Sequence, residues 1–319
     1  MIAPITLFAR AGVTGVDLSN LSAIISALDS AAVTATQADT TAKLQNIVDA
    51  YKAVLVLADG GQNTTTQVTA GQFETLGVTG VNTTTAGATS VPSTYKASLL
   101  SNVVDGLASV AVDTVPELQA LANAVTAVMV TANGTVSGAS AVTKAQLDGM
   151  GITGVTDNNL ADVLAAISNT PDNGSSVNTL PALQYVVNLG VNSASQSALT
   201  TISNFAADNT SSQPISGAFA YQGTVPTLRD YANAGVTGID NNNLESVNDA
   251  LATNVVDRAV VSDTAGIQAV INAYNAVFVL ADGNANAGTA LTALQLTKVG
   301  ATIGNAVTVA TNLRSEEHT

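Results

Sequence analysis

The chain of 319 residues has no cysteine and no tryptophan, and its single histidine is His318. Without cysteine there are no disulfides, thiolate metal sites or cysteine nucleophiles. A sequence with no other histidine also lacks Ser-His-Asp triads, Cys-His dyads and ordinary zinc sites. Carboxylate-only catalysis stays formally open, but capping of helix starts accounts for most acidic residues. These absences predict that the protein is not an enzyme.

Basic and aromatic residues are also scarce. Nine Lys and Arg stand against 23 Asp and Glu, which gives a formal net charge of −14, and aromatic residues make up 3%. Because phosphate binding depends on clustered Lys and Arg, we expect no nucleic-acid partner. Apolar runs fall far short of the roughly 18 residues of a membrane span, so no membrane insertion by this segment is expected. An acidic surface rich in Thr, Asn, Ser and Gly is typical of extracellular bacterial proteins.

One phrase, Gly-Val-Thr-Gly-Val, recurs with small changes along the chain. Its copies start at Gly12, Gly77, Gly151 and Gly235, with their second glycines at Gly15, Gly80, Gly154 and Gly238, and a decayed fifth copy covers 300–304. By subtraction of their first positions the spacings are 65, 74, 84 and 65 residues, and loops absorb such insertions at little cost. Each phrase is predicted to be a structural corner. Its first glycine would end a helix with a positive backbone angle, and Thr-Gly would reverse the chain.

Three helical patterns surround the corners. An Asp followed by an apolar stripe covers 17–28, 157–167 and 240–251, and the matching helix of the second copy is delayed to 95–107. A longer pattern with a capping residue covers 39–60, 113–134, 179–190 and 263–283, with Gly60 as a left-handed stop. Shorter helices are predicted before the corners, over 69–76, 143–150, 225–234 and 292–299.

The predicted fold is therefore all-α, an elongated array of tandem repeats of about 65–85 residues, each with two longer helices and a short third. We expect a partial repeat over 1–11, repeats over 12–76, 77–150, 151–234 and 235–299, and a partial repeat over 300–313. The start aligns within a repeat, which predicts a fragment of a longer protein. Residues 314–319 match the translation of a sequencing-library adapter and are predicted to be a non-native tail.

Calcium is the one cofactor that the sequence leaves open. Asp157, Asp240 and Glu245 lie among asparagines that supply further oxygen ligands. Their spacing does not match an EF-hand loop or a Gly-Asp nonapeptide. We therefore expect no cofactor, with these three residues as weak calcium candidates.

The corner phrase with its following Asp-x-x-Leu, and the later Asp-Thr-x-x-x-Leu-Gln-x-x-Val-x-Ala-Tyr, resemble tandem helical repeats of very large secreted bacterial surface proteins of the adhesin and biofilm-matrix type. The resemblance implies a structural or adhesive segment at the cell surface, acting as a stalk, spacer or contact module. Its partners would be neighbouring repeats of the same longer chain, and cell-surface or matrix components. The alternative is a calcium- or glycan-binding surface-layer module. The third repeat lacks the long helix with its Tyr and is expected to be irregular.

Overall fold

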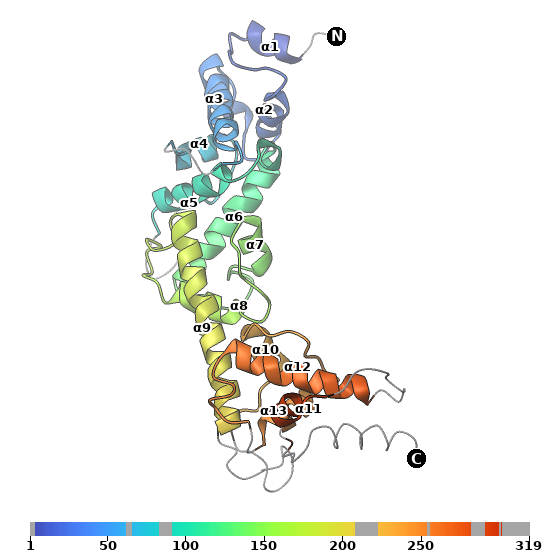
Figure 1. Ribbon diagram of the computed structural model, residues 1–319. Coiled ribbons are helices and arrows are strands. Elements are labelled where there is room, and N and C mark those ends of the chain that lie inside the picture. Colours follow the sequence, from blue (N-terminus) through green and yellow to red (C-terminus); the bar gives the residue numbers. More distant parts are fainter. Residues whose placement is uncertain are drawn as a thin grey trace. The chain divides into compact units, whose positions relative to one another are not determined.

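The computed structural model describes residues 4–61, 66–82, 91–207, 223–253, 256–281, 291–299 and 301. Within these ranges the regular structure is helical, and the one β feature is an isolated antiparallel bridge between Asp59 and Ala108 (Figure 1). The all-α prediction is confirmed. The chain divides into two compact units, Met1–Val191 and Asn192–Thr319, which are described separately.

The helices of the first unit alternate between short and long. They are α1 (Pro4–Arg10), α2 (Leu21–Leu28), η1 (Ala35–Gln37), α3 (Thr41–Leu57), α4 (Ala70–Thr75), α5 (Ser93–Asp105), η2 (Ser109–Ala111), α6 (Val115–Ala132), α7 (Lys144–Gly149) and α8 (Leu160–Ser168). The next helix, α9 (Leu180–Ala207), has residues in both units. The second unit also holds α10 (Leu228–Asn233), α11 (Leu244–Leu251), α12 (Thr264–Leu280) and α13 (Ala293–Lys298).

Four six-residue helices, α4, α7, α10 and α13, lie where the short helices before the corners were predicted. Each starts with a threonine in a capping box, as Thr69 does by accepting from the Gln72 amide while the Gln72 side chain accepts from the Thr69 amide. Each also buries one large side chain, which is Phe73 in α4. A helix this short is marginal alone, so the cap and the buried anchor fix it in place.

The four long helices are α3, α6, α9 and α12, and three of them follow the prediction closely. Thr40 caps α3, Tyr51 is completely buried in it, and Gly60 has a φ of 88° just beyond its end. The predicted end near Gly190 is wrong, because α9 is 28 residues long and ends at Ala207. The prediction that the third copy lacks the long helix is wrong for the same reason. A Cβ at Gly190 would lie 2.6 Å from the Val163 Cα, so this glycine allows close contact with α8 and does not terminate the helix.

The helices that follow the corners begin later than predicted. Asp17, Asp157 and Asp240 were expected to cap them, but the N-cap residues are Asn20, Asn159 and Asn243. Leu18, expected in the buried stripe, is 86% exposed because it lies in the turn before α2. In the second copy the helix α5 is delayed, as predicted.

The apolar core of the first unit is continuous. One cluster of buried side chains runs from Val13 to Val187 and takes residues from α2 through α9. A second cluster in the other unit joins residues between Ala198 and Ile271. Helices next to different corners of the first unit therefore share one core.

Candidate functional site: the glycine corners and their junctions

All eight predicted corner glycines adopt positive φ angles, from 76° at Gly12 to 88° at Gly77. The first glycine of each corner ends a six-residue helix or α1. In the second corner the Val78 amide donates to the Phe73 carbonyl at 3.0 Å and the Gly77 amide donates to the Glu74 carbonyl at 2.9 Å. This is the Schellman arrangement, and matching bonds close the other three corners. The predicted left-handed helix ends are confirmed.

A glutamine from the long helix clamps the threonine of each corner at two points. The Gln45 Oε1 accepts from the Thr14 amide at 2.9 Å, and its Nε2 donates to the Thr14 carbonyl at 3.2 Å. The same pair of bonds joins Gln119 to Thr79, Gln184 to Thr153, and Gln268 to Thr237. We call each pair a glutamine clamp. The side-chain amide of Gln offers an acceptor and a donor side by side and does not titrate, which suits it to both bonds.

The second glycine of each corner is held by a buried side chain, which we call the brace. Asn20 Nδ2 donates to the Gly15 carbonyl at 2.9 Å while its Oδ1 accepts from the Asp17 amide at 3.0 Å. Asn159 and Asn243 make the same bonds in the third and fourth corners. In the second corner the brace is Lys96, 1% exposed, whose Nζ donates to the Gly80 carbonyl at 2.9 Å. Burial lowers the pKa of Lys96.

Hydrogen bonds also join helices that belong to different corners. Ser26 Oγ in α2 accepts from the Val115 amide, the first of α6, at 2.9 Å. Asn102 Oδ1 in α5 accepts from the Leu180 amide, the first of α9, at 3.2 Å. The Tyr51 hydroxyl donates to the Val112 carbonyl at 3.2 Å, and burial raises the pKa of Tyr51. Free amides at a helix start need a partner, and here a side chain of a helix next to an earlier corner supplies it.

Sequence reasoning missed the clamps, the braces and these junctions. The Leu-Gln pair of the long helix recurs in the sequence, which was a usable signal, but no role could be assigned to it. Two of the brace asparagines, Asn159 and Asn243, lie in the segments that the sequence offers as weak calcium candidates.

The structure does not gather the weak calcium candidates into one site. Asp157 lies in the first unit, whereas Asp240 and Glu245 lie in the second, and all three are exposed. Asp240 Oδ1 accepts from the Asn242 amide at 2.7 Å, which closes a local turn. Over the described ranges, no three His, Cys, Asp or Glu side chains come together as a possible metal site.

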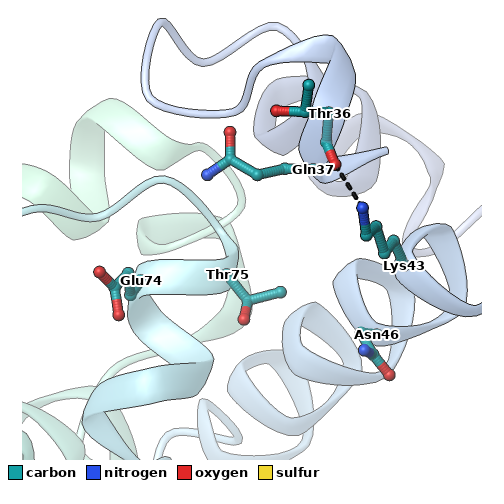
Figure 2. Close-up of a pocket in the computed structure, with 6 residues that line it drawn as sticks. All are labelled: Thr36, Gln37, Lys43, Asn46, Glu74 and Thr75. Carbon is teal, nitrogen blue, oxygen red and sulfur yellow. Dashed lines mark hydrogen bonds between the residues drawn. The ribbon is translucent and has the colours of Figure 1, made fainter. Parts of the chain in front are cut away.

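Two hollows lie on the first unit. One of about 390 Å³, shown in Figure 2, is lined by Thr36, Gln37, Lys43, Asn46, Glu74 and Thr75. Its Lys43 ammonium already donates to the Thr36 carbonyl at 2.6 Å and to Asp39 at 2.8 Å. The other, of about 500 Å³, lies at the junction of α2, the second corner and α6, and its lining includes Ser26, Asp29, Gly77, Thr79 and Val115. Each lining holds one carboxylate, Glu74 in the first and Asp29 in the second.

One described helix, α6, is long and apolar enough to cross a membrane by length and composition, and half of its residues are buried within the protein. A core helix passes the same test, and α6 contributes many residues to the core of the first unit.

Comparison with known proteins adds no family to this description. No protein-family model, characterised protein or solved structure matches the chain.

Proposed function

We propose that the chain is a non-catalytic tandem-repeat segment of a larger bacterial cell-surface or extracellular protein, where it serves as a stalk, spacer or contact module. One observation carries the proposal: four corners share the same helix end, the same glutamine clamp and an equivalent brace. Agreement at this level between segments of different sequence favours one repeated unit. Each repeat comprises a corner, the helix after it, a long helix and a six-residue helix.

Hydrogen bonds between repeats support an array. The first amide of α6 donates to Ser26 of the repeat before it, and the first amide of α9 donates to Asn102 in the same way. The shared core of the first unit points the same way. In such arrays each repeat is stabilised mainly by its neighbours, so the repeats act together as one extended body. We therefore propose an elongated shape for the whole chain.

A surface role agrees with the chemistry of the chain. Its clamps and junctions are made of amides, hydroxyls and backbone groups, which do not titrate near neutral pH. A cysteine-free chain has no thiols to oxidise outside the cell. Its partners would be neighbouring repeats and cell-surface or matrix components.

Small-angle X-ray scattering on the full chain tests the array. A compact domain of 319 residues has a radius of gyration of about 20 Å. We expect a value at least half as large again, about 30 Å, and a rod-like scattering profile at intermediate angles. A radius of gyration near 20 Å would show that the units fold back into one globule and would refute the array.

A second measurement on the same sample addresses the calcium alternative. For the proposed spacer, the melting temperature should be the same in calcium chloride and in EDTA. A rise of several degrees in calcium chloride would favour the calcium-binding surface-layer module instead, because a ligand that binds only the folded state stabilises it.

A further inference from the structure

The hollow at the junction of α2, the second corner and α6 contains an unbalanced negative charge. Its volume of about 500 Å³ lies within the range of ligand sites, and Asp29 is part of its lining. The Asp29 carboxylate is exposed, and it forms no hydrogen bond or ion pair with any residue that the structure describes. Among the described residues that line the hollow, none is Lys, Arg or His. We call this space the junction hollow.

The end of α2 adds to the negative charge. Ser26 lies in the last turn of this helix and Asp29 is its C-cap, and both residues line the junction hollow. The carbonyl groups at the C-terminal end of a helix carry a partial negative charge and favour cations. This end of the hollow is therefore suited to a positively charged group.

The start of α6, which forms another part of the lining, is not suited to an anion. The Val115 amide donates to Ser26 Oγ at 2.9 Å, and Pro116 has no amide hydrogen. The Glu117 amide donates to Thr114 Oγ1 at 3.5 Å, and the Glu117 carboxylate adds a negative charge to the first turn. A phosphate or carboxylate would find no free amide among the first three residues of this helix.

Four residues of the lining are apolar. Ala31 and Ala32 follow α2, and Val115 and Pro116 begin α6. Methyl groups and a proline ring can pack against an aliphatic chain, but they offer nothing to a metal ion, which takes several oxygen ligands. A lysine side chain has an aliphatic stem that packs on apolar surface and an ammonium group at its end. It therefore matches both parts of the junction hollow.

We propose that the junction hollow binds a lysine side chain of a basic partner protein. The ammonium group would pair with the Asp29 carboxylate, and the stem would lie against the alanines and Pro116. The net charge of −14 supports a basic partner, because opposite charges speed association and like charges disfavour it.

This inference extends the contact-module role of the proposed function by giving that module a partner. All the residues of the junction hollow lie in the first unit. The inference therefore does not depend on an elongated shape of the whole chain.

Fluorescence anisotropy with a dye-labelled heptalysine peptide tests the inference on the full chain. The buffer should contain about 0.15 M NaCl, where the screening length is about 8 Å and distant charges contribute little. The wild-type chain should bind the peptide, and it should not bind the same peptide with acetylated lysines, because acetylation removes the charge. A wild-type chain that does not bind heptalysine overturns the inference.

Matched variants locate the binding site. Asp29→Asn removes the charge and keeps the shape, and should weaken binding by about threefold or more. Asp172→Asn, the same change at an exposed residue outside the hollow, should have little effect. Ala31→Phe places a ring in the hollow and should weaken binding as much as Asp29→Asn does. Ala35→Phe, at an exposed alanine outside the hollow, should bind as the wild type does. Far-UV circular dichroism verifies that each variant is folded.

The variants also show which conclusion fails. Equal loss of binding in Asp29→Asn and Asp172→Asn would mean that the peptide responds only to net charge, and it would overturn the inference. Full binding by Ala31→Phe would overturn it as well. If heptalysine does not bind while scattering shows an extended array, the inference is wrong and the proposed spacer stands. A compact chain that still loses binding only in Asp29→Asn and Ala31→Phe would refute the array and support the inference.

Discussion

Gly77 and Gly80 differ in surroundings and share a backbone conformation. Their φ angles are 88° and 85°, so alanine meets the same left-handed strain at both. A Cβ at Gly77 would overlap the Ser30 Oγ and lie 2.9 Å from the Ser30 Cβ. The nearest atom to a Cβ at Gly80 is the Thr126 Oγ1, at 3.7 Å. The pair therefore separates strain from steric overlap.

The two costs can be estimated independently. The left-handed conformation costs an L-residue about 1–2 kcal/mol. Forcing extra atoms into a packed site adds about 1–3 kcal/mol. We therefore expect Gly80→Ala to lower the free energy of unfolding by about 1–2 kcal/mol, and Gly77→Ala by about 2–5 kcal/mol.

Urea denaturation followed by circular dichroism at 222 nm measures both values in this helical protein. Ser30→Gly, added to Gly77→Ala, should recover the steric part and leave only the strain, with Ser30→Gly alone as the reference for a double-mutant cycle. If Gly77→Ala costs no more than Gly80→Ala, or if Ser30→Gly restores nothing, the packing of the corner against α2 has been misread.

Three further substitutions test the clamps and braces through urea denaturation. Gln119→Leu removes the clamp on Thr79 and should cost about 1 kcal/mol. Gln196→Leu, in α9, should change stability by under about 0.5 kcal/mol, because the Gln196 side chain is exposed and has no hydrogen bond within the described ranges. Burial lowers the pKa of Lys96 in the folded chain, whereas in the unfolded chain this pKa is about 10.4. At pH values between the two, the unfolded chain binds more protons than the folded chain. Wild-type stability relative to Lys96→Met should therefore rise with pH across this window, and a constant difference from pH 7 to pH 10 would contradict the burial of a protonated amine. Asn159→Asp replaces a buried donor with a carboxylate that faces the Gly154 carbonyl, which raises the pKa of the new acid. The variant should be less stable than the wild type by about 1–3 kcal/mol at pH 7, and this difference should shrink at pH 3. An equal difference at both pH values would refute the role of Asn159 as a brace.

The helical class and the corner glycines could be predicted because they depend on local chemistry. A residue such as Gly77 can be recognised in the sequence, since only glycine adopts a positive φ at little energetic cost at the end of an apolar pattern. The six-residue helices could be predicted for the same reason, from threonine caps and the glycine stop. Gly190 misled the prediction because glycine also permits close packing inside a helix, and only the position of Val163 distinguishes the two cases.

The clamps could not be predicted because their partners are far apart in sequence. Gln45 is 31 residues from Thr14, and nothing near either residue identifies the other. The braces could not be predicted for a different reason. Asn159 lies among acidic and amide residues that equally suit a solvated turn or a cation loop, and its burial decides between them. The tertiary fold supplies that information.

The spacing of the clamps explains why one brace is a lysine. The clamped Thr and Gln are 31 positions apart in three corners and 40 apart in the second, so the second corner has nine more residues between its Thr and its Gln. In that copy the helix begins at Ser93, three residues before the brace position, which therefore lies inside the helix and not at its N-cap. An asparagine at such a position would be too short to leave the helix and reach the corner, whereas the long side chain of Lys96 reaches the Gly80 carbonyl. Lys96 therefore serves as the brace in the corner with the longer spacing, and the clamp between Thr79 and Gln119 has the same bonds as the others. The clamp bonds are thus kept although the spacing between their partners differs from corner to corner.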